Sequence, residues 1–197
     1  MKINFKPAFL MLAISITGFG QHLFAQDMYK INDSKDINMK LSGTSTLHKW
    51  SMNAQTFSGE ARFGFTDHLL STVSALNFSL AVQDLKSGEK GLDKNAYKAL
   101  KTGQYKDILY KLTSAKVSPE KDKRYLIATQ GKLTIAGVTN DVNMDVYCVV
   151  NQDNSITCTG SDKLKMSDYQ VKPPSFMLGA MKTGDAITLD FTLVYKK

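Results

Sequence analysis

The sequence predicts an all-β protein built as an antiparallel barrel of about eight strands with one short helical insertion. Most of the chain beyond residue 25 alternates apolar and polar residues with a period of two, which is typical of half-buried strands. Long helical periodicity is absent from the sequence, so a parallel α/β sheet is not expected. Closing the sheet into a barrel removes its exposed edges, and a β-sandwich is the competing architecture.

The expected strands follow one another with short connections. Alternating apolar residues mark 37–41, 50–54, 57–65, 76–82, 108–112, 125–135, 142–150, 156–164 and 187–195. The alternation changes phase near His48 and Lys49, so we expect a turn or bulge there. Gly137 predicts another turn, and Pro173 with Pro174 predicts the end of a ladder.

The polar segment after the fourth expected strand predicts the helical insertion. Asp93 has the character of an N-cap, and a short helix is expected from Lys94 to about Lys101. Tyr97 and Leu100 would be its larger side chains.

Residues 1–25 have the layout of a secretory signal peptide, with cleavage expected after Ala25. Lys2 and Lys6 precede an apolar segment at 9–16, and the leader ends in a small residue. The apolar run is shorter than the roughly 20 residues that a membrane-spanning helix needs. The sequence therefore predicts a periplasmic or secreted protein in which residues 26–197 form one domain.

The chain is basic, with a formal net charge of +7. Such a surface can attract nucleic acid or anionic lipid head groups. The lysines are spread along the chain, without a dense cluster that alternates with aromatic residues. We therefore expect a solvated surface, no nucleic-acid partner and at most transient contact with a membrane surface.

Cys148 and Cys158 flank a probable turn at 151–154. Pairing Val150 with Ile156 would place the cysteines opposite each other, within about 5 Å on one side of a hairpin. That separation suits a disulfide, and export would permit one. Two small buried thiols are the alternative. The cysteine spacing matches no metal-binding motif.

Enzyme signatures are scarce in this sequence. It contains no nucleophile elbow, phosphate-binding loop, dinucleotide glycine motif or zinc-protease helix. A catalytic triad could use His48 or His68 with Ser45 and Asp67, but no local motif supports it. Once the leader with His22 is removed, two histidines remain, too few for a typical zinc site. We expect no catalytic residues, no metal and no cofactor, and therefore a binding protein.

Four stretches of the sequence stand out when taken in order: 41–50 (LSGTSTLHKW), 85–88 with 99–108, 131–139 (GKLTIAGVT), and 165–174 followed by 184–185. This set resembles the YceI-like family of lipid- and polyisoprenoid-binding proteins. Together they span about Met39 to Tyr195. The resemblance implies a lipocalin-like antiparallel barrel with an elongated apolar interior. Trp50 and the two cysteines depart from the family pattern.

The resemblance also implies binding of a long amphiphile: a polyisoprenoid, an isoprenoid quinone or a fatty-acid derivative. A barrel of about eight strands can hold one small ligand. The candidate ligand-binding residues are His48, Trp50, Phe63, Phe78, Tyr110, Met144, Asp168, Tyr169 and Phe191. Of these, His48, Trp50, Asp168 and Tyr169 are expected at the mouth, around the polar head of the ligand.

Flexible methionines at positions 39, 52, 144 and 166 would adapt to a varied lipid chain, or simply fill gaps in a core. Two alternatives to a carrier therefore stay open. One is an envelope enzyme acting on an amphiphile in the same barrel. The other is a structural or stress-related envelope protein with a filled interior. The sequence does not determine the oligomeric state.

Overall fold

The computed structural model describes residues 26–31, 37–176 and 181–197, so the predicted signal peptide lies outside the described residues. Its strands are β1 (Gln26–Ile31), β2 (Asn38–Ser45), β3 (Lys49–Ala54), β4 (Ser58–Thr66), β5 (Leu69–Ala81), β6 (Leu85–Lys86), β7 (Asp107–Pro119), β8 (Arg124–Ile135), β9 (Val138–Val150), β10 (Ile156–Lys165), β11 (Ser175–Phe176) and β12 (Met181–Lys196). Its helical elements are η1 (Val82–Asp84), α1 (Lys90–Ala99) and η2 (Met166–Tyr169).

Eight of these strands close into an antiparallel ring in the order β1-β4-β5-β7-β8-β9-β10-β12. The ring closes where β1 pairs with β12, with Lys30 opposite Lys196 and Ile31 opposite Tyr195. This confirms the predicted lipocalin-like antiparallel barrel of about eight strands with one short helix. The sequence pattern did not predict β1, the strand that completes the ring.

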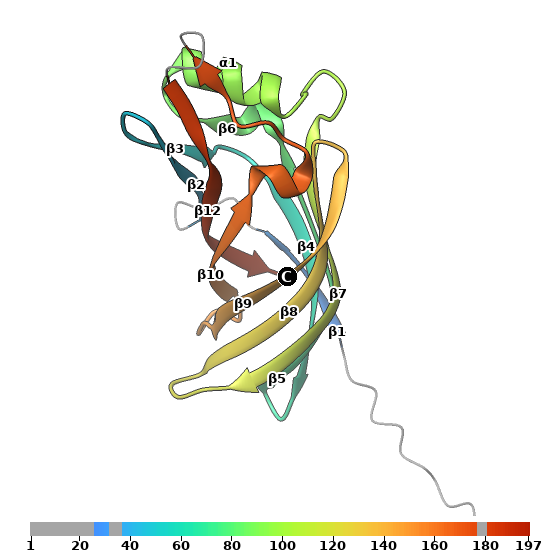
Figure 1. Ribbon diagram of the computed structural model, residues 1–197. Coiled ribbons are helices and arrows are strands. Elements are labelled where there is room, and N and C mark those ends of the chain that lie inside the picture. The colour runs from blue at the N-terminus through green and yellow to red at the C-terminus, as the bar shows by residue number, and fades with distance from the viewer. Residues whose placement is uncertain (1–25, 32–36, 177–180) are drawn as a thin grey trace, which may run out of the picture.

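Further strands extend the barrel at one end. β2 pairs with β12 from Asn38–Thr192 to Ser45–Thr183, β3 pairs with β2, and β6 pairs with β3. Because η1 leads directly from β5 into β6, the chain itself spans from the ring to this extension. Figure 1 shows α1 lying across the same end, which we call the α1 end. The β4–β5 and β7–β8 turns lie at the opposite, lower end (Figure 1).

The predicted turns are present. The Ser45 backbone N–H donates to the His48 carbonyl at 2.8 Å and closes the β2–β3 turn, where the alternation changes phase. Ala136 and Gly137 join β8 to β9 with φ values of 50° and 82°. Positive φ at both central residues is the geometry that matches the twist of a two-residue hairpin.

The predicted disulfide is also present. Cys148 and Cys158 are bonded with their Cα atoms 4.2 Å apart. They face each other across β9 and β10, two residues along the ladder from Val150 and Ile156 and therefore on the same side of the hairpin. The bond therefore joins two strands that the turn at 151–154 already connects.

The helix differs from its predicted position. It spans Lys90–Ala99, so it begins four residues before the predicted start at Lys94, and Glu89 occupies the N-cap position. Asp93 lies within the first turns and accepts hydrogen bonds from the backbone N–H of Ser87 at 2.8 Å and from its hydroxyl at 2.7 Å. The prediction of Asp93 as the N-cap is wrong, because its carboxylate instead holds the preceding loop against the helix.

The lower end of the barrel is filled with aromatic side chains. The rings of Tyr29 and Phe63 meet edge to face at 5.3 Å, and those of Phe63 and Tyr195 at 5.6 Å. All three side chains are almost fully buried, as is Ile156. Edge-to-face packing of this kind stabilises a core beyond the burial of its area. The filled end forms the floor of the barrel.

Candidate functional site

A cavity of about 490 Å³ lies inside the barrel, between the α1 end and the disulfide. Its volume falls within the roughly 300–1,000 Å³ that small-molecule sites occupy. Most lining residues are apolar and come from inward-facing positions of the ring strands. The filled-interior alternative is therefore wrong for the barrel as folded.

Glycines in the wall leave room for aromatic rings beside the cavity. Gly131 of β8 backs the ring of Tyr110, and a Cβ at this position would collide with that ring. Gly160 of β10 lies directly opposite Phe191 of β12, and a Cβ there would lie 2.8 Å from the Cε1 atom of the phenyl ring and collide with it. Because the rings lie over bare backbone, they cover the wall and take up less of the lumen.

The helix α1 borders the cavity with its apolar side. Leu92, Ala96, Ala99 and Leu100 all line the cavity, and their spacing puts them on one face of a helix. No residue of α1 is fully buried. The helix therefore covers the α1 end without packing into a closed core.

Tyr97 fastens this helix to the barrel from outside the cavity. Its hydroxyl lies 2.8 Å from the Leu85 carbonyl and 3.0 Å from the Gln83 carbonyl, either of which can accept its proton. The Lys86 ammonium donates to the same hydroxyl at 2.9 Å. These contacts tie α1 to η1 and β6.

Ionisable side chains border the cavity mainly at the α1 end. His48, Glu89, Lys165 and Lys182 line it there and are exposed. Asp162 of β10 is different, because its side chain lines the cavity and is only partly exposed. Burial raises the pKa of this carboxyl, and the Lys163 backbone N–H that donates to it at 2.8 Å opposes the rise. An anionic group inside the cavity would meet this carboxyl.

Tyr169 lies in the cavity wall near Asp162. It is buried, and burial followed by the charges of Asp162 and Asp168 raises its pKa to about 12. Asp168 itself is exposed and does not line the cavity, and its backbone carbonyl accepts a hydrogen bond from the Asn140 amide at 2.8 Å. The turn of η2 directs Tyr169 inward, which leaves the preceding carboxylate outside.

The other predicted ligand-binding residues meet in this single cavity. Those that line it are His48, Trp50, Phe63, Phe78, Tyr110, Met144, Tyr169 and Phe191, together with the four methionines expected to adapt to a chain. Asp168 is the exception. Whether these residues bind a ligand stays a prediction.

Sequence reasoning did not select Asp162, Tyr195 or the apolar side of α1. Asp162 and Tyr195 follow the inward phase of β10 and β12, so the alternation contained the signal for both. The helix was expected as an insertion, but its predicted start was four residues too late. Only the structure shows that its apolar side faces the cavity.

The catalytic triad of Ser45, Asp67 and a histidine is not assembled. The Ser45 hydroxyl donates to the His48 backbone carbonyl at 2.9 Å and not to the imidazole ring. Asp67 and His68 form the β4–β5 turn at the opposite end of the barrel (Figure 1). Among the residues that the structure describes, no three His, Cys, Asp or Glu side chains group as a metal site requires. None of the described helices is long and apolar enough to cross a membrane.

The model of the YceI-like domain matches residues 29–195. The chain belongs to the YceI-like domain family. The match runs from the second half of β1 to the penultimate residue of β12, and so includes part or all of every ring strand and the extension that carries α1. No curated protein matches the chain in sequence.

Solved structures of similar fold support this assignment. BcnA of Burkholderia cenocepacia superposes with a TM-score of 0.64 at 17% identity, covering 80% of this chain and 95% of BcnA. A polyisoprenoid binding domain from Saccharophagus degradans, implicated in plant cell wall breakdown, gives 0.65 at 12% identity, covering 85% and 97%. The YceI protein of Campylobacter jejuni gives 0.56 at 19% identity, covering 74% and 84%. At these identities the similarity establishes the fold of this YceI-like chain.

Proposed function

We propose that this YceI-like protein binds a long amphiphilic lipid in its barrel and holds it without chemical change. The ligand classes that fit are a polyisoprenoid, an isoprenoid quinone and a fatty-acid derivative. The observation that carries the proposal is the apolar cavity of about 490 Å³ between the aromatic floor and α1. A polyisoprenoid-binding relative of the same fold supports this choice of ligand class.

The cavity wall is suited to hold a chain by burial alone. Each methylene group moved from water into an apolar site contributes about 0.8 kcal/mol. Met39, Met52, Met144 and Met166 lie in the wall and can change rotamer around chains of different shape. Tight binding therefore needs no covalent step.

We place the protein in the periplasm or outside the cell. The leader-like segment at 1–25 and the Cys148–Cys158 disulfide both support export, because structural disulfides persist in oxidising compartments. A carrier in such a compartment would shield an apolar chain from water between membranes.

Native mass spectrometry of residues 26–197, purified after export, tests the proposal. We expect an added mass that organic extraction releases as an isoprenoid or acyl compound. Val146→Phe, which narrows the cavity from β9, should lower the occupancy. Val149→Phe on the exposed side of the same strand should not. A ligand-free mass, together with no uptake of a hydrophobic fluorescent probe, would contradict the proposal.

A further inference from the structure

Two tyrosines of the cavity wall carry buried hydroxyls that the barrel itself does not satisfy. Tyr110 is 8% exposed and Tyr195 is 1% exposed, and neither hydroxyl has a hydrogen-bond partner among the described residues. Thr129 lies beside Tyr110 and partly offsets the rise in the pKa of that phenol, but its hydroxyl donates to the Met144 carbonyl at 2.9 Å and makes no hydrogen bond of acceptable geometry with the Tyr110 hydroxyl. Buried polar groups are nearly always paired, so two unpaired hydroxyls beside one cavity require an explanation.

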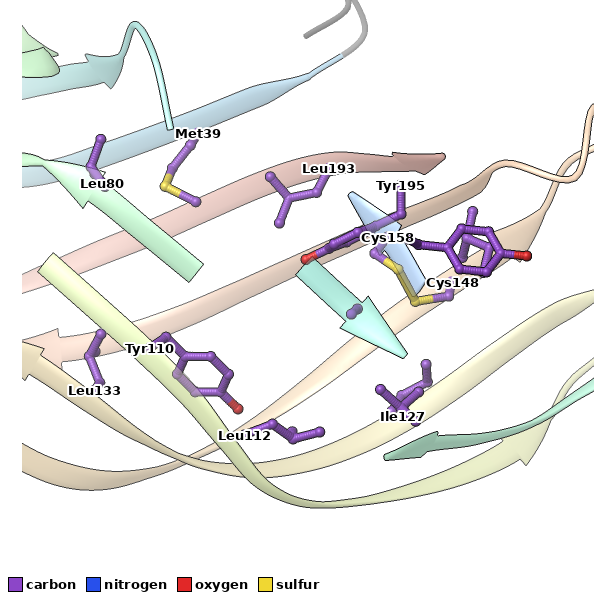
Figure 2. Packing of buried hydrophobic residues seen from close by; sticks show 14 of the residues in the cluster. Met39, Leu80, Tyr110, Leu112, Ile127, Leu133, Cys148, Cys158, Leu193 and Tyr195 are labelled. Atoms are coloured by element: carbon purple, nitrogen blue, oxygen red, sulfur yellow. A yellow bond between two sulfur atoms is a disulfide. The ribbon is translucent and has the colours of Figure 1, made fainter. Parts of the chain in front are cut away.

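The two residues face each other across the barrel. Tyr110 is on β7 and Tyr195 is on β12, and these strands are four places apart in the ring of eight. Figure 2 shows the two phenol rings reaching from separate strands into the interior near Leu112 and Leu193. Tyr110 is close enough to add to the effect of burial in raising the pKa of Tyr195.

Among the described residues, the surroundings of this pair are apolar and include no cation. Leu112, Ile127 and Leu193 lie around it, and the disulfide is next to it (Figure 2). The lysines that line the cavity, Lys165 and Lys182, are exposed residues at the α1 end. A phosphate or ionised carboxylate placed here would be desolvated without a counter-charge, which is very unfavourable. A neutral oxygen avoids that cost and still accepts or donates hydrogen bonds.

We propose that Tyr110 and Tyr195 bind a neutral oxygen-bearing group of the lipid, such as an alcohol, phenol or quinone carbonyl, deep inside the barrel. This inference rests on the proposed lipid-binding function and narrows its ligand class. The lipid then enters with its polar group first, and its chain extends toward α1. This orientation is opposite to the one expected from the sequence, in which the polar head stays at the mouth.

The test compares three probes that share a chain of equal carbon number: geranylgeraniol, geranylgeranyl phosphate and the hydrocarbon phytane. Binding is measured by displacement of a hydrophobic fluorescent dye and by the emission of Trp50, which lines the cavity and is the only tryptophan in the chain. The variants are Tyr110→Phe, Tyr195→Phe and the double variant. The matched control is Tyr125→Phe, which removes a buried hydroxyl outside the cavity lining.

We expect the wild-type protein to bind the alcohol more tightly than the hydrocarbon or the phosphate. The double variant should lose about tenfold in affinity for the alcohol, as the loss of two hydrogen bonds implies, and keep its affinity for phytane. Tyr125→Phe should keep the wild-type preference. The unliganded double variant should melt at the same temperature as the wild type or higher, because phenylalanine removes hydroxyls that lack partners.

Two results would overturn the inference and leave lipid binding intact. One is an unchanged preference for the alcohol in the double variant, which would mean that water alone satisfies the hydroxyls. The other is a wild-type preference for the phosphate. A lower melting temperature of the unliganded double variant would also count against the inference, because it would mean that the hydroxyls have partners in the empty barrel. The binding comparison is then repeated with the two single variants. If the wild type binds none of the three probes, the proposed function itself fails.

Discussion

The indole of Trp50 covers Gly43, which lies directly opposite it on the neighbouring strand. The indole N–H donates to the Thr44 carbonyl at 3.1 Å and holds the ring against β2. A Cβ at Gly43 would lie 2.7 Å from the Cε2 atom of the ring, closer than packed atoms allow. This contact lets the indole line the cavity from the wall of the barrel.

Gly43→Ala should therefore force the indole away from β2 and toward the lumen. We expect a loss of about 1–3 kcal/mol in the free energy of unfolding, as overpacking in a core typically costs. The emission of Trp50 should shift in the folded state as its surroundings change. Gly103→Ala is the control, because a Cβ there meets nothing within 4 Å. Equal urea midpoints for the two variants would contradict the steric role of Gly43.

Loss of the disulfide should destabilise the barrel without preventing its closure. The bridge links residues ten apart in the sequence, and a loop of that size implies about 2–3 kcal/mol. Urea unfolding of the wild type with and without reductant measures this difference. The double variant Cys148→Ala, Cys158→Ala should have the same urea midpoint as the reduced wild type, and reductant should not change it. A wild type whose midpoint is unaffected by full reduction would refute the prediction.

Alkaline pH should destabilise the protein, partly through Tyr169. Burial, followed by the charges of Asp162 and Asp168, raises the pKa of this phenol from 10.0 to about 12. The folded state therefore holds the proton more tightly than the unfolded chain does. Its contribution is complete below about pH 10 and is lost as the pH rises toward 12. Tyr169→Phe should flatten the fall in unfolding free energy above pH 10, whereas parallel curves would argue against this cause.

Tyr97→Phe should loosen α1 with little effect on the rest of the barrel. The change removes the hydroxyl that joins Lys86 and the Leu85 carbonyl to the helix, a local loss of about 1–2 kcal/mol. Hydrogen exchange of residues 90–99 should accelerate about 5- to 30-fold, as that free energy implies. Tyr147→Phe on β9 is the matched control. Unchanged exchange in α1 would show that its apolar side alone holds the helix.

The sequence by itself determined most of the long strands, the family resemblance and much of the cavity wall. Alternation with a period of two is local, so it identified the inward positions of Tyr110 and Phe191 without knowledge of the partner strands. The register of Cys148 with Cys158 followed for the same reason, because a short hairpin turn defines which residues face each other.

Only the tertiary structure decided how the barrel closes and what its interior leaves empty. β1 joins β12 from the other end of the chain, and no local pattern encodes a pairing between residues so distant in sequence. Alternation also treats Tyr195 and Ile156 alike as inward residues. The volume of the cavity depends on where glycines such as Gly131 let rings lie against the wall. Whether a hydroxyl is left without a partner depends on every side chain around it, and those neighbours come from strands that meet only in the folded ring.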